Sequence, residues 1–273
     1  MIYRRLGDTN EEIPAIGLGT WEIGGRETPD YSKDREQIDV IVRAIEMGYS
    51  HIDTAEYYAG GHTEEIIGDA IGLFDRSELF ITSKVWPSHL RRNELHKALD
   101  DSLKRLKTDY VDLYLIHWPN PDIPLQETLE AMSQEVESGR IRFIGVSNFD
   151  VDLLKKAVSI SPKPIVNNQV LFNIEDRQAM YELLPLCQKE GITLTAYSPL
   201  KRNLLSNSSK EILEGMAKKY YASTQQIMLA WLLSKDGVVV IPKASKIDHL
   251  KSNMDSRNIA LSHEDLKLLD DLS

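Results

Sequence analysis

The chain has 273 residues, of which 42% are hydrophobic and 27% charged, and its formal net charge is −10. This composition is ordinary for a globular protein with a full-sized core and excludes a fibrous or low-complexity chain. The acidic balance argues against nucleic acid as a partner, and no apolar run is long enough to span a membrane, so we expect neither partner.

The N-terminus carries no targeting signal that we can recognise. Residues 1–8 lack the apolar segment of a signal peptide. Cys187, the single cysteine, cannot form an internal disulfide, and it shares a helical stripe with Leu183 and Leu184, which is typical of a core residue. We therefore expect a cytoplasmic protein without cysteine chemistry.

Short β-branched runs alternate with amphipathic helical stripes along the whole chain. A short hairpin over Tyr3–Leu6 and Glu12–Ile13 comes first. Eight strands are then predicted, at Ala15–Leu18, Ser50–Asp53, Leu79–Lys84, Tyr110–Ile116, Ile141–Ser147, Ile165–Gln169, Thr193–Tyr197 and Val238–Ile241.

Glycines punctuate this alternation. Gly48, Gly139, Gly191 and Gly237 each end a helical stripe just before a strand, where a left-handed cap is expected. Eight such units predict an α/β fold, a closed (β/α)8 TIM barrel. No linker divides residues 1–273, so a single domain is expected, with polar loops at Glu22–Asp34 and Lys201–Lys210 over the rim.

Polar side chains stand at the ends of successive predicted strands. Asp53 and Lys84 end the second and third strands, Tyr58 follows Asp53 by a short loop, and His117 follows the fourth strand. Catalytic groups of such barrels lie at the C-terminal ends of the strands. Each residue taken singly has an ordinary structural explanation, but the four together predict an active site.

These residue types suit proton donation to a carbonyl oxygen. A phenol titrates at about 10, so we expect Lys84 to lower the pKa of Tyr58 and make it a general acid, with Asp53 holding the lysine. His117 can hydrogen-bond to the same oxygen. Because no nucleophile accompanies the donor, carbonyl reduction is favoured over hydrolysis, and the hydride must come from a cofactor.

No Gly-x-Gly-x-x-Gly or other nucleotide-binding loop occurs, so a dinucleotide must be held by the barrel rim. The segment from Ile241 to Lys246 opens a predicted helix, and its backbone amides with Lys243 and Lys246 suit a phosphate. A metal hydrolase site built on His51, Asp53 and His117 is the alternative, but it has too few ligands, so no metal is expected.

Seven strings resemble, in order, those of the aldo-keto reductases over about residues 3 to 270. They are Gly17-Leu-Gly-Thr-Trp21, Asp53-Thr-Ala-x-x-Tyr58, Ser83-Lys84, Ile116-His-Trp-Pro119, Gly145-Val-Ser-Asn-Phe149, Tyr197-Ser-Pro-Leu200 and Ile241-Pro-Lys243. The resemblance implies a barrel whose base is closed by the N-terminal hairpin, with NADP(H) lying across the rim. It also implies that Tyr58 is the proton donor, with Lys84, Asp53 and His117 as its catalytic partners.

The resemblance implies a set of cofactor-binding residues as well. Ser147, Asn148 and Gln169 match the carboxamide-binding positions, and Tyr197 matches the ring that stacks on the nicotinamide. The other implied contacts are Gly19, Thr20, Trp21, Asp53, Ser198, Leu200, Arg202, Ile241, Lys243, Ser245, His249 and Asn253.

Three positions depart from the family pattern. Ala59 replaces a glycine after the tyrosine, Ala244 replaces a serine, and His249 replaces an arginine near the adenine. The first is expected to be harmless. A guanidinium holds a phosphate better than an imidazole does, so the other two leave NAD(H) open as a second cofactor.

The expected substrate site is aromatic, with Trp21, Trp86, His117 and Trp118 around it. The family resemblance implies small aldehydes, ketones, 2-oxoaldehydes or open-chain sugars as substrates and a monomer or weak homo-oligomer. A nucleotide-binding sensor or regulatory subunit with little turnover is the alternative function, although the four catalytic residue types are all retained.

Overall fold

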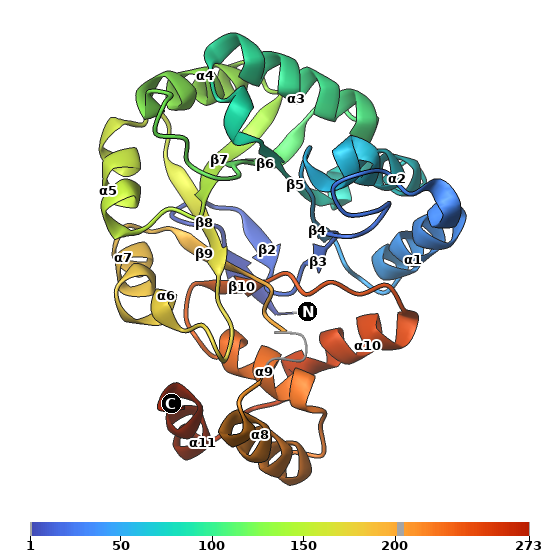
Figure 1. The fold of residues 1–273 in the computed structure, drawn as a ribbon, viewed down its shortest axis with the longest axis vertical. Helices are drawn as coiled ribbons and strands as arrows, with labels where there is room; N and C mark the ends of the chain where they lie inside the picture. The colour runs from blue at the N-terminus through green and yellow to red at the C-terminus, as the bar shows by residue number, and fades with distance from the viewer. Residues whose placement is uncertain (1, 201–204, 273) are drawn as a thin grey trace.

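A computed structural model describes residues 2–200 and 205–272. Eight parallel strands form one sheet in the order β10-β9-β8-β7-β6-β5-β4-β3. They are β3 (Leu18–Gly19), β4 (His51–Asp53), β5 (Phe80–Val85), β6 (Val111–Ile116), β7 (Ile141–Ser147), β8 (Ile165–Leu171), β9 (Thr193–Tyr197) and β10 (Val238–Val240). Figure 1 shows this sheet curled on itself inside a ring of helices. The predicted (β/α)8 barrel is confirmed.

The helices follow the strands around the barrel, and α8 and α11 lie outside the ring near the C-terminus (Figure 1). The α-helices are α1 (Asp34–Glu46), α2 (His62–Ile71), α3 (Arg92–Leu106), α4 (Leu125–Glu137), α5 (Val151–Ile160), α6 (Gln178–Tyr181), α7 (Leu183–Lys189), α8 (Asn207–Lys219), α9 (Thr224–Leu233), α10 (Ile247–Asp255) and α11 (His263–Asp270). Short 3-10 turns are η1 (Tyr31–Lys33), η2 (Tyr58–Gly61), η3 (Arg76–Glu78), η4 (Pro87–His89) and η5 (Ser256–Asn258).

The barrel closes where residues 15–19 meet β10. The Val240 amide donates to the Ala15 carbonyl at 2.9 Å, and the Gly17 amide donates to the Val240 carbonyl at 2.8 Å. A Cβ atom on Gly19 would lie 2.4 Å from the Ile241 carbonyl oxygen, so only glycine allows this approach. The first strand was predicted at Ala15–Leu18, but its regular pairing with β4 begins at Leu18, because residues 15–17 bond to β10 instead.

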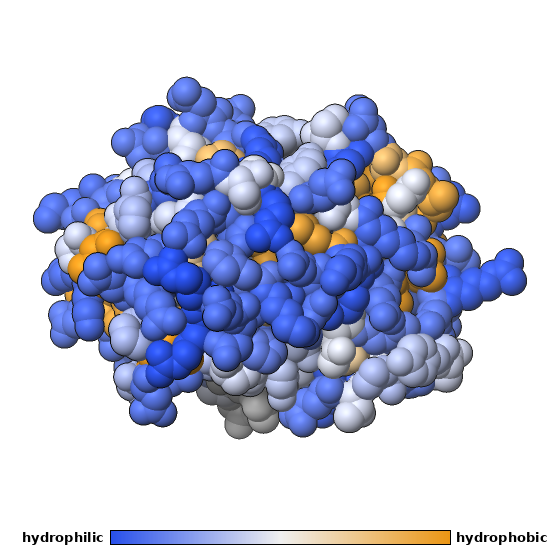
Figure 2. Space-filling view, turned by 90° about the horizontal axis from the view of Figure 1, so that it is seen from above, coloured by the Kyte–Doolittle hydropathy of each residue, from blue (hydrophilic) through white to orange (hydrophobic). Residues whose placement is uncertain are grey.

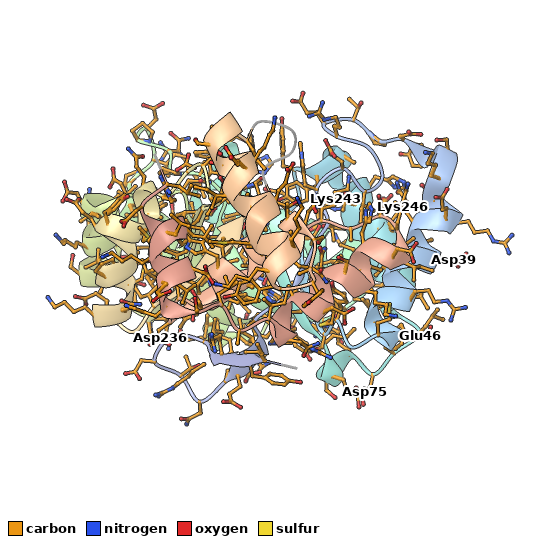
Figure 3. The ribbon with its side chains drawn as sticks, turned by 90° about the horizontal axis from the view of Figure 1, so that it is seen from below. Asp39, Glu46, Asp75, Asp236, Lys243 and Lys246 are labelled. Atoms are coloured by element: carbon orange, nitrogen blue, oxygen red, sulfur yellow. The ribbon has the colours of Figure 1, made fainter. Side chains whose placement is uncertain are left out.

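The N-terminal hairpin closes one end of the barrel. Strands β1 (Tyr3–Arg5) and β2 (Glu12–Pro14) pair antiparallel. Leu6 and Ile13 are fully buried against side chains that line the barrel interior: Phe80, Leu113, Leu115, Val166 and Val239. Figure 3 places Lys243 and Lys246 at the opposite end from the hairpin. The hairpin therefore leaves the other rim available for the site.

An ionic cluster fastens the hairpin end. Asp112 is fully buried, and one carboxylate oxygen accepts from Arg76 at 2.7 Å and from the Ile81 amide at 2.8 Å. The other oxygen accepts from Arg142 at 2.7 Å, and Arg142 also binds Glu11 of the hairpin turn. Both oxygens of this carboxylate therefore accept hydrogen bonds, as a buried charge requires.

The predicted glycine caps are present in the structure. Gly48, Gly139, Gly191 and Gly237 all have positive φ, as the expected caps require. Cys187 is buried, which confirms its place in the core.

The face shown in Figure 2 is mainly hydrophilic, with small separate apolar areas. Within the described ranges, no helix is long and apolar enough to cross a membrane.

One loop prediction is wrong in part. Residues 201–204 lie outside the described residues, but helix α8 begins at Asn207, inside the predicted loop Lys201–Lys210. The Ser206 hydroxyl accepts from the Ser209 amide at 3.1 Å and caps this helix. The stretch Glu22–Asp34 is irregular up to the turn η1, as expected.

Candidate active site

Neighbouring strands bring a buried ammonium and a carboxylate together. Strand β4 ends at Asp53, and Lys84 lies near the end of the adjacent β5. The Lys84 Nζ donates to Asp53 Oδ1 at 2.6 Å, to the Thr54 carbonyl at 2.8 Å and to the Tyr58 hydroxyl at 3.1 Å. Lys84 and Asp53 are 0% and 1% exposed, so this pair is shielded from water. The structure therefore brings three of the four predicted catalytic residues into contact.

Burial and charge act against each other in this cluster. Burial lowers the pKa of Lys84, but Asp53 and Tyr58 raise it by more, so the lysine stays charged. Burial raises the pKa of Tyr58, and Lys84 opposes this only in part. The net lowering of the tyrosine pKa that we expected is therefore wrong in this structure: burial, with a smaller contribution from Asp53, raises the pKa of Tyr58 by more than Lys84 lowers it.

His117 follows β6 and is 8% exposed. Burial, with a smaller contribution from Lys84, lowers the pKa of His117 to about 2, so the imidazole is neutral near pH 7. Its ring centroid lies 5.7 Å from that of Tyr58, and its Nδ1 has no hydrogen-bond partner. A neutral imidazole has one donor and one acceptor nitrogen, so His117 can present an N–H to an oxygen near Tyr58.

Three aromatic rings are arranged beside this cluster. Tyr57 stacks on Trp86 with centroids 3.8 Å apart, and Trp21 is parallel to Tyr57 at 6.3 Å. Trp86 also meets His117 edge-on at 5.2 Å. Trp118 is 43% exposed and has no ring contact with this stack, and its place in the substrate site stays a prediction.

The sequence did not lead us to predict Tyr57 as a site residue. It lies next to the proposed proton donor, and the residue pattern offers no reason to choose between two consecutive tyrosines for a wall of the site. The only available signal was its position between Asp53 and Tyr58 in a loop that must reach the rim.

Polar side chains at the ends of β7, β8 and β9 form a continuous chain of hydrogen bonds. Tyr197 donates to Asn148 Oδ1 at 2.9 Å, and Asn148 Nδ2 donates to Ser147 Oγ and to the His117 carbonyl, both at 3.0 Å. Gln169 Nε2 donates to Asp53 Oδ2 at 2.7 Å. The predicted carboxamide-binding residues thus lie directly beside the Lys84 cluster.

Left-handed backbone occurs at several site positions. Ala59, Asn148 and Ser198 have φ of 50°, 62° and 47°. Such a conformation costs a non-glycine residue about 1–2 kcal/mol. Ala59 therefore carries backbone strain that a glycine would avoid, and the expectation that this replacement does not harm function stays a prediction.

The predicted phosphate residues lie where β10 leads into α10. Lys243 Nζ contacts Glu22 Oε2 at 2.9 Å, an ion pair that sequence reasoning missed. Ser245, Lys246 and His249 are exposed around the start of α10, and Asn253 is buried within it. Arg202 is outside the described residues, Leu200 and Ser198 follow β9, and the Asn173 amide donates to the Ser198 carbonyl at 3.2 Å.

The remaining predicted cofactor contacts lie at the seam between β3 and β10. Thr20 donates from its hydroxyl to the Asp53 carbonyl at 2.8 Å, Gly19 bridges to Lys243, and Ile241 is buried.

His51, a candidate ligand in the metal-site alternative, packs edge-on against Phe80 inside the barrel. Within the described part of the chain, no group of three His, Cys, Asp or Glu side chains lies close enough to hold a metal ion.

Residues 15–273 match the model of the Aldo/keto reductase family. The chain therefore belongs to the Aldo/keto reductase family and is an oxidoreductase.

Individual relatives agree with this assignment. The methylglyoxal reductase YeaE of Escherichia coli is 36% identical, covering 94% of this chain and 90% of that protein. The glyoxal reductase of Bacillus subtilis is 38% identical, covering 96% and 90%.

Solved structures are similar as well. The thermostable aldo-keto reductase Tm1743, solved with the inhibitor epalrestat, is 61% identical with a TM-score of 0.99 over 100% of both chains. An aldo/keto reductase of Klebsiella pneumoniae, solved with NADP and acetate, is 38% identical with a TM-score of 0.90 over 98% of this chain and 94% of that one.

Proposed function

We propose that this protein is an NADP(H)-dependent reductase of small aldehydes and ketones, 2-oxoaldehydes in particular, with Tyr58 as general acid. The observation that carries the proposal is the contact of the buried Lys84 ammonium with the Tyr58 hydroxyl at 3.1 Å, beside a neutral His117. The alternative, a sensor subunit with little turnover, has no specific contact in its favour.

The proton route follows from the hydrogen bonds. At neutral pH Tyr58 is protonated, because burial raises its pKa, and it can give its proton to a carbonyl oxygen. Lys84 stabilises the phenolate that remains, and Asp53 holds Lys84 through Oδ1. His117 can donate a second hydrogen bond to the same oxygen and orient the carbonyl.

The residues on the rim fit a nicotinamide dinucleotide. The hydroxyl of Ser147 and the amide of Asn148 match the donors and acceptors of a carboxamide, and the partly exposed Tyr197 ring lies beside them. Lys243 and the exposed start of α10 offer positive charge and backbone N–H groups to a phosphate. When bound, the reduced nicotinamide supplies the hydride to the carbonyl carbon.

The substrate class rests on two kinds of support. Stacked rings of Trp21, Tyr57 and Trp86 form an apolar wall beside His117, which suits a small uncharged carbonyl compound. Two of the relatives reported above are named as a methylglyoxal reductase and a glyoxal reductase. NAD(H) use, open-chain sugars, a cytoplasmic location and a monomer or weak homo-oligomer remain predictions.

A two-step assay tests the proposal. NADPH and NADH are titrated separately, with quenching of tryptophan fluorescence as the signal, and methylglyoxal is then added while nicotinamide absorbance is followed. We expect tighter binding of NADPH and substrate-dependent loss of absorbance. Binding without turnover on any carbonyl would favour the sensor alternative, and no binding of either nucleotide would refute the proposal.

A further inference from the structure

Glu56 lies in the rim but takes no part in the proton route. Its side chain is 8% exposed, and its Oε1 accepts from the Trp86 backbone N–H at 2.5 Å and contacts His89 Nδ1 at 3.0 Å. A carboxylate that accepts from a backbone N–H makes a charge-assisted hydrogen bond, stronger than a neutral one. The burial of Glu56 and its contacts, next to the proposed reaction site, point to a specific role for this side chain.

The location of Glu56 links the two loops that carry the catalytic residues. Glu56 lies between Asp53 and Tyr58, in the loop after β4. Trp86 is the residue directly after β5, the strand that carries Lys84. The Glu56 amide also donates to the Lys84 carbonyl at 3.4 Å. Glu56 therefore ties the tyrosine loop to the end of the lysine strand by both its backbone and its side chain.

The bonded backbone position controls where the Trp86 ring lies. The ring stacks on Tyr57 with planes 8° apart and meets His117 nearly at right angles. On the far side, Asn120 Nδ2 donates to the Pro87 carbonyl at 3.0 Å, so the turn η4 is held from two loops. We expect loss of the Glu56 side-chain bond to release one of these attachments and to loosen the Trp86 ring against His117.

We propose that Glu56 is a positioning residue for substrate recognition. By holding the Trp86 backbone, it fixes the aromatic wall beside His117 that contacts the substituent of the carbonyl carbon. This inference rests on the proposed reductase function. It assigns no proton transfer and no cofactor contact to Glu56.

The test compares Glu56→Ala, Glu56→Gln and Glu127→Ala. Glu127 is the matched control, because its Oε1 also accepts a backbone N–H, that of Arg92 at 3.1 Å, outside the site. For Glu56→Ala we expect KM for methylglyoxal to rise about tenfold with kcat changed less than about threefold, since only substrate contacts are loosened. Glu56→Gln should recover most of the loss, because its amide oxygen can accept from the Trp86 N–H.

Two readouts do not depend on turnover. The near-ultraviolet circular dichroism from the Tyr57–Trp86 stack should weaken in Glu56→Ala and not in Glu127→Ala, while the Kd for NADPH stays the same. An unchanged spectrum, or a KM within about twofold of the wild type, would overturn the inference. An equal loss in Glu127→Ala would do the same. A wild type that reduces no carbonyl refutes the proposed function instead, and the spectrum still decides the role of Glu56.

Discussion

The Tyr58 hydroxyl lies 3.1 Å from the Lys84 ammonium, and both side chains are removed from water. The lysine therefore does not act on the tyrosine as a free charge in solvent would. In the proposed mechanism it would stabilise the phenolate that forms when a proton leaves, while burial raises the pKa of the resting phenol. The contribution of the Tyr58 hydroxyl can therefore be tested separately from that of the Tyr58 ring.

The variant Tyr58→Phe keeps the ring and loses the hydroxyl. We expect kcat for methylglyoxal to fall about 10²- to 10⁴-fold, the usual contribution of a general acid, with unchanged Kd for NADPH. Steady-state kinetics and fluorescence titration measure the two quantities. Tyr57→Phe is the matched control and should retain most of the rate. Near wild-type turnover by Tyr58→Phe would contradict the role given to this residue.

His117 makes folding stability depend on pH in one direction. The pKa of His117 is lowered to about 2 in the folded protein, so the unfolded chain binds this proton more readily. Its contribution to stability is therefore present above about pH 6.5 and is lost as the pH falls toward 2, by at most about 1.4 kcal/mol per pH unit. Between pH 7 and pH 5 the free energy of unfolding, measured in urea, should fall less for His117→Gln than for the wild type. Equal falls would refute this.

His62 should act in the opposite direction. Its ring nitrogens contact Glu65 at 2.7 Å and Asp34 at 2.9 Å. Burial lowers the pKa of His62, but the two carboxylates raise it by more, so the folded value lies above the ordinary one. The stabilisation is complete below about pH 6.5 and is lost as the pH rises through the folded pKa.

The variant His62→Gln tests this sign. The free energies of unfolding of wild type and variant are measured in urea at pH 5.5 and pH 8.5. The wild type should be more stable than the variant by a larger margin at the lower pH. An advantage that grows with pH would show that the imidazole is held neutral.

Asp112 should matter for stability and not for chemistry. Asp112→Ala leaves Arg76 and Arg142 without their shared carboxylate, and removal of one partner of a buried ion pair costs about 3–5 kcal/mol. Because Arg142 is 40% exposed, we expect the lower end of this range. Urea unfolding measures it, and Asp109→Ala, an exposed carboxylate nearby, is the control. A loss below about 1 kcal/mol would contradict the buried-pair account.

The barrel could be predicted because its signals are local and repeated. A glycine such as Gly139 marks a helix end by its own backbone requirement, and each β-branched run marks a strand. The contact of Asp53 with Lys84 also follows from the order of adjacent parallel strands. These inferences need no knowledge of loop shape.

The features that the sequence did not predict correctly, or did not predict at all, depend on loop geometry or on a balance of opposing effects. The direction of the Tyr58 pKa required knowledge of how far burial outweighs Lys84. The stacking of Tyr57 and the exposure of Trp118 depend on which way a loop side chain turns. The Glu22–Lys243 pair joins loops from opposite ends of the chain, and no periodicity in the sequence reports on it.

The seam between residues 15–19 and β10 has a consequence for synthesis on the ribosome. Ala15 emerges among the first residues, and its partner Val240 among the last, so the seam cannot close until nearly the whole chain has been made. Until then the sheet has two open edges, each of which can pair with another nascent chain. The early half of the barrel must therefore wait for the late half, and a chaperone that shields sheet edges would be of most use to this protein during translation.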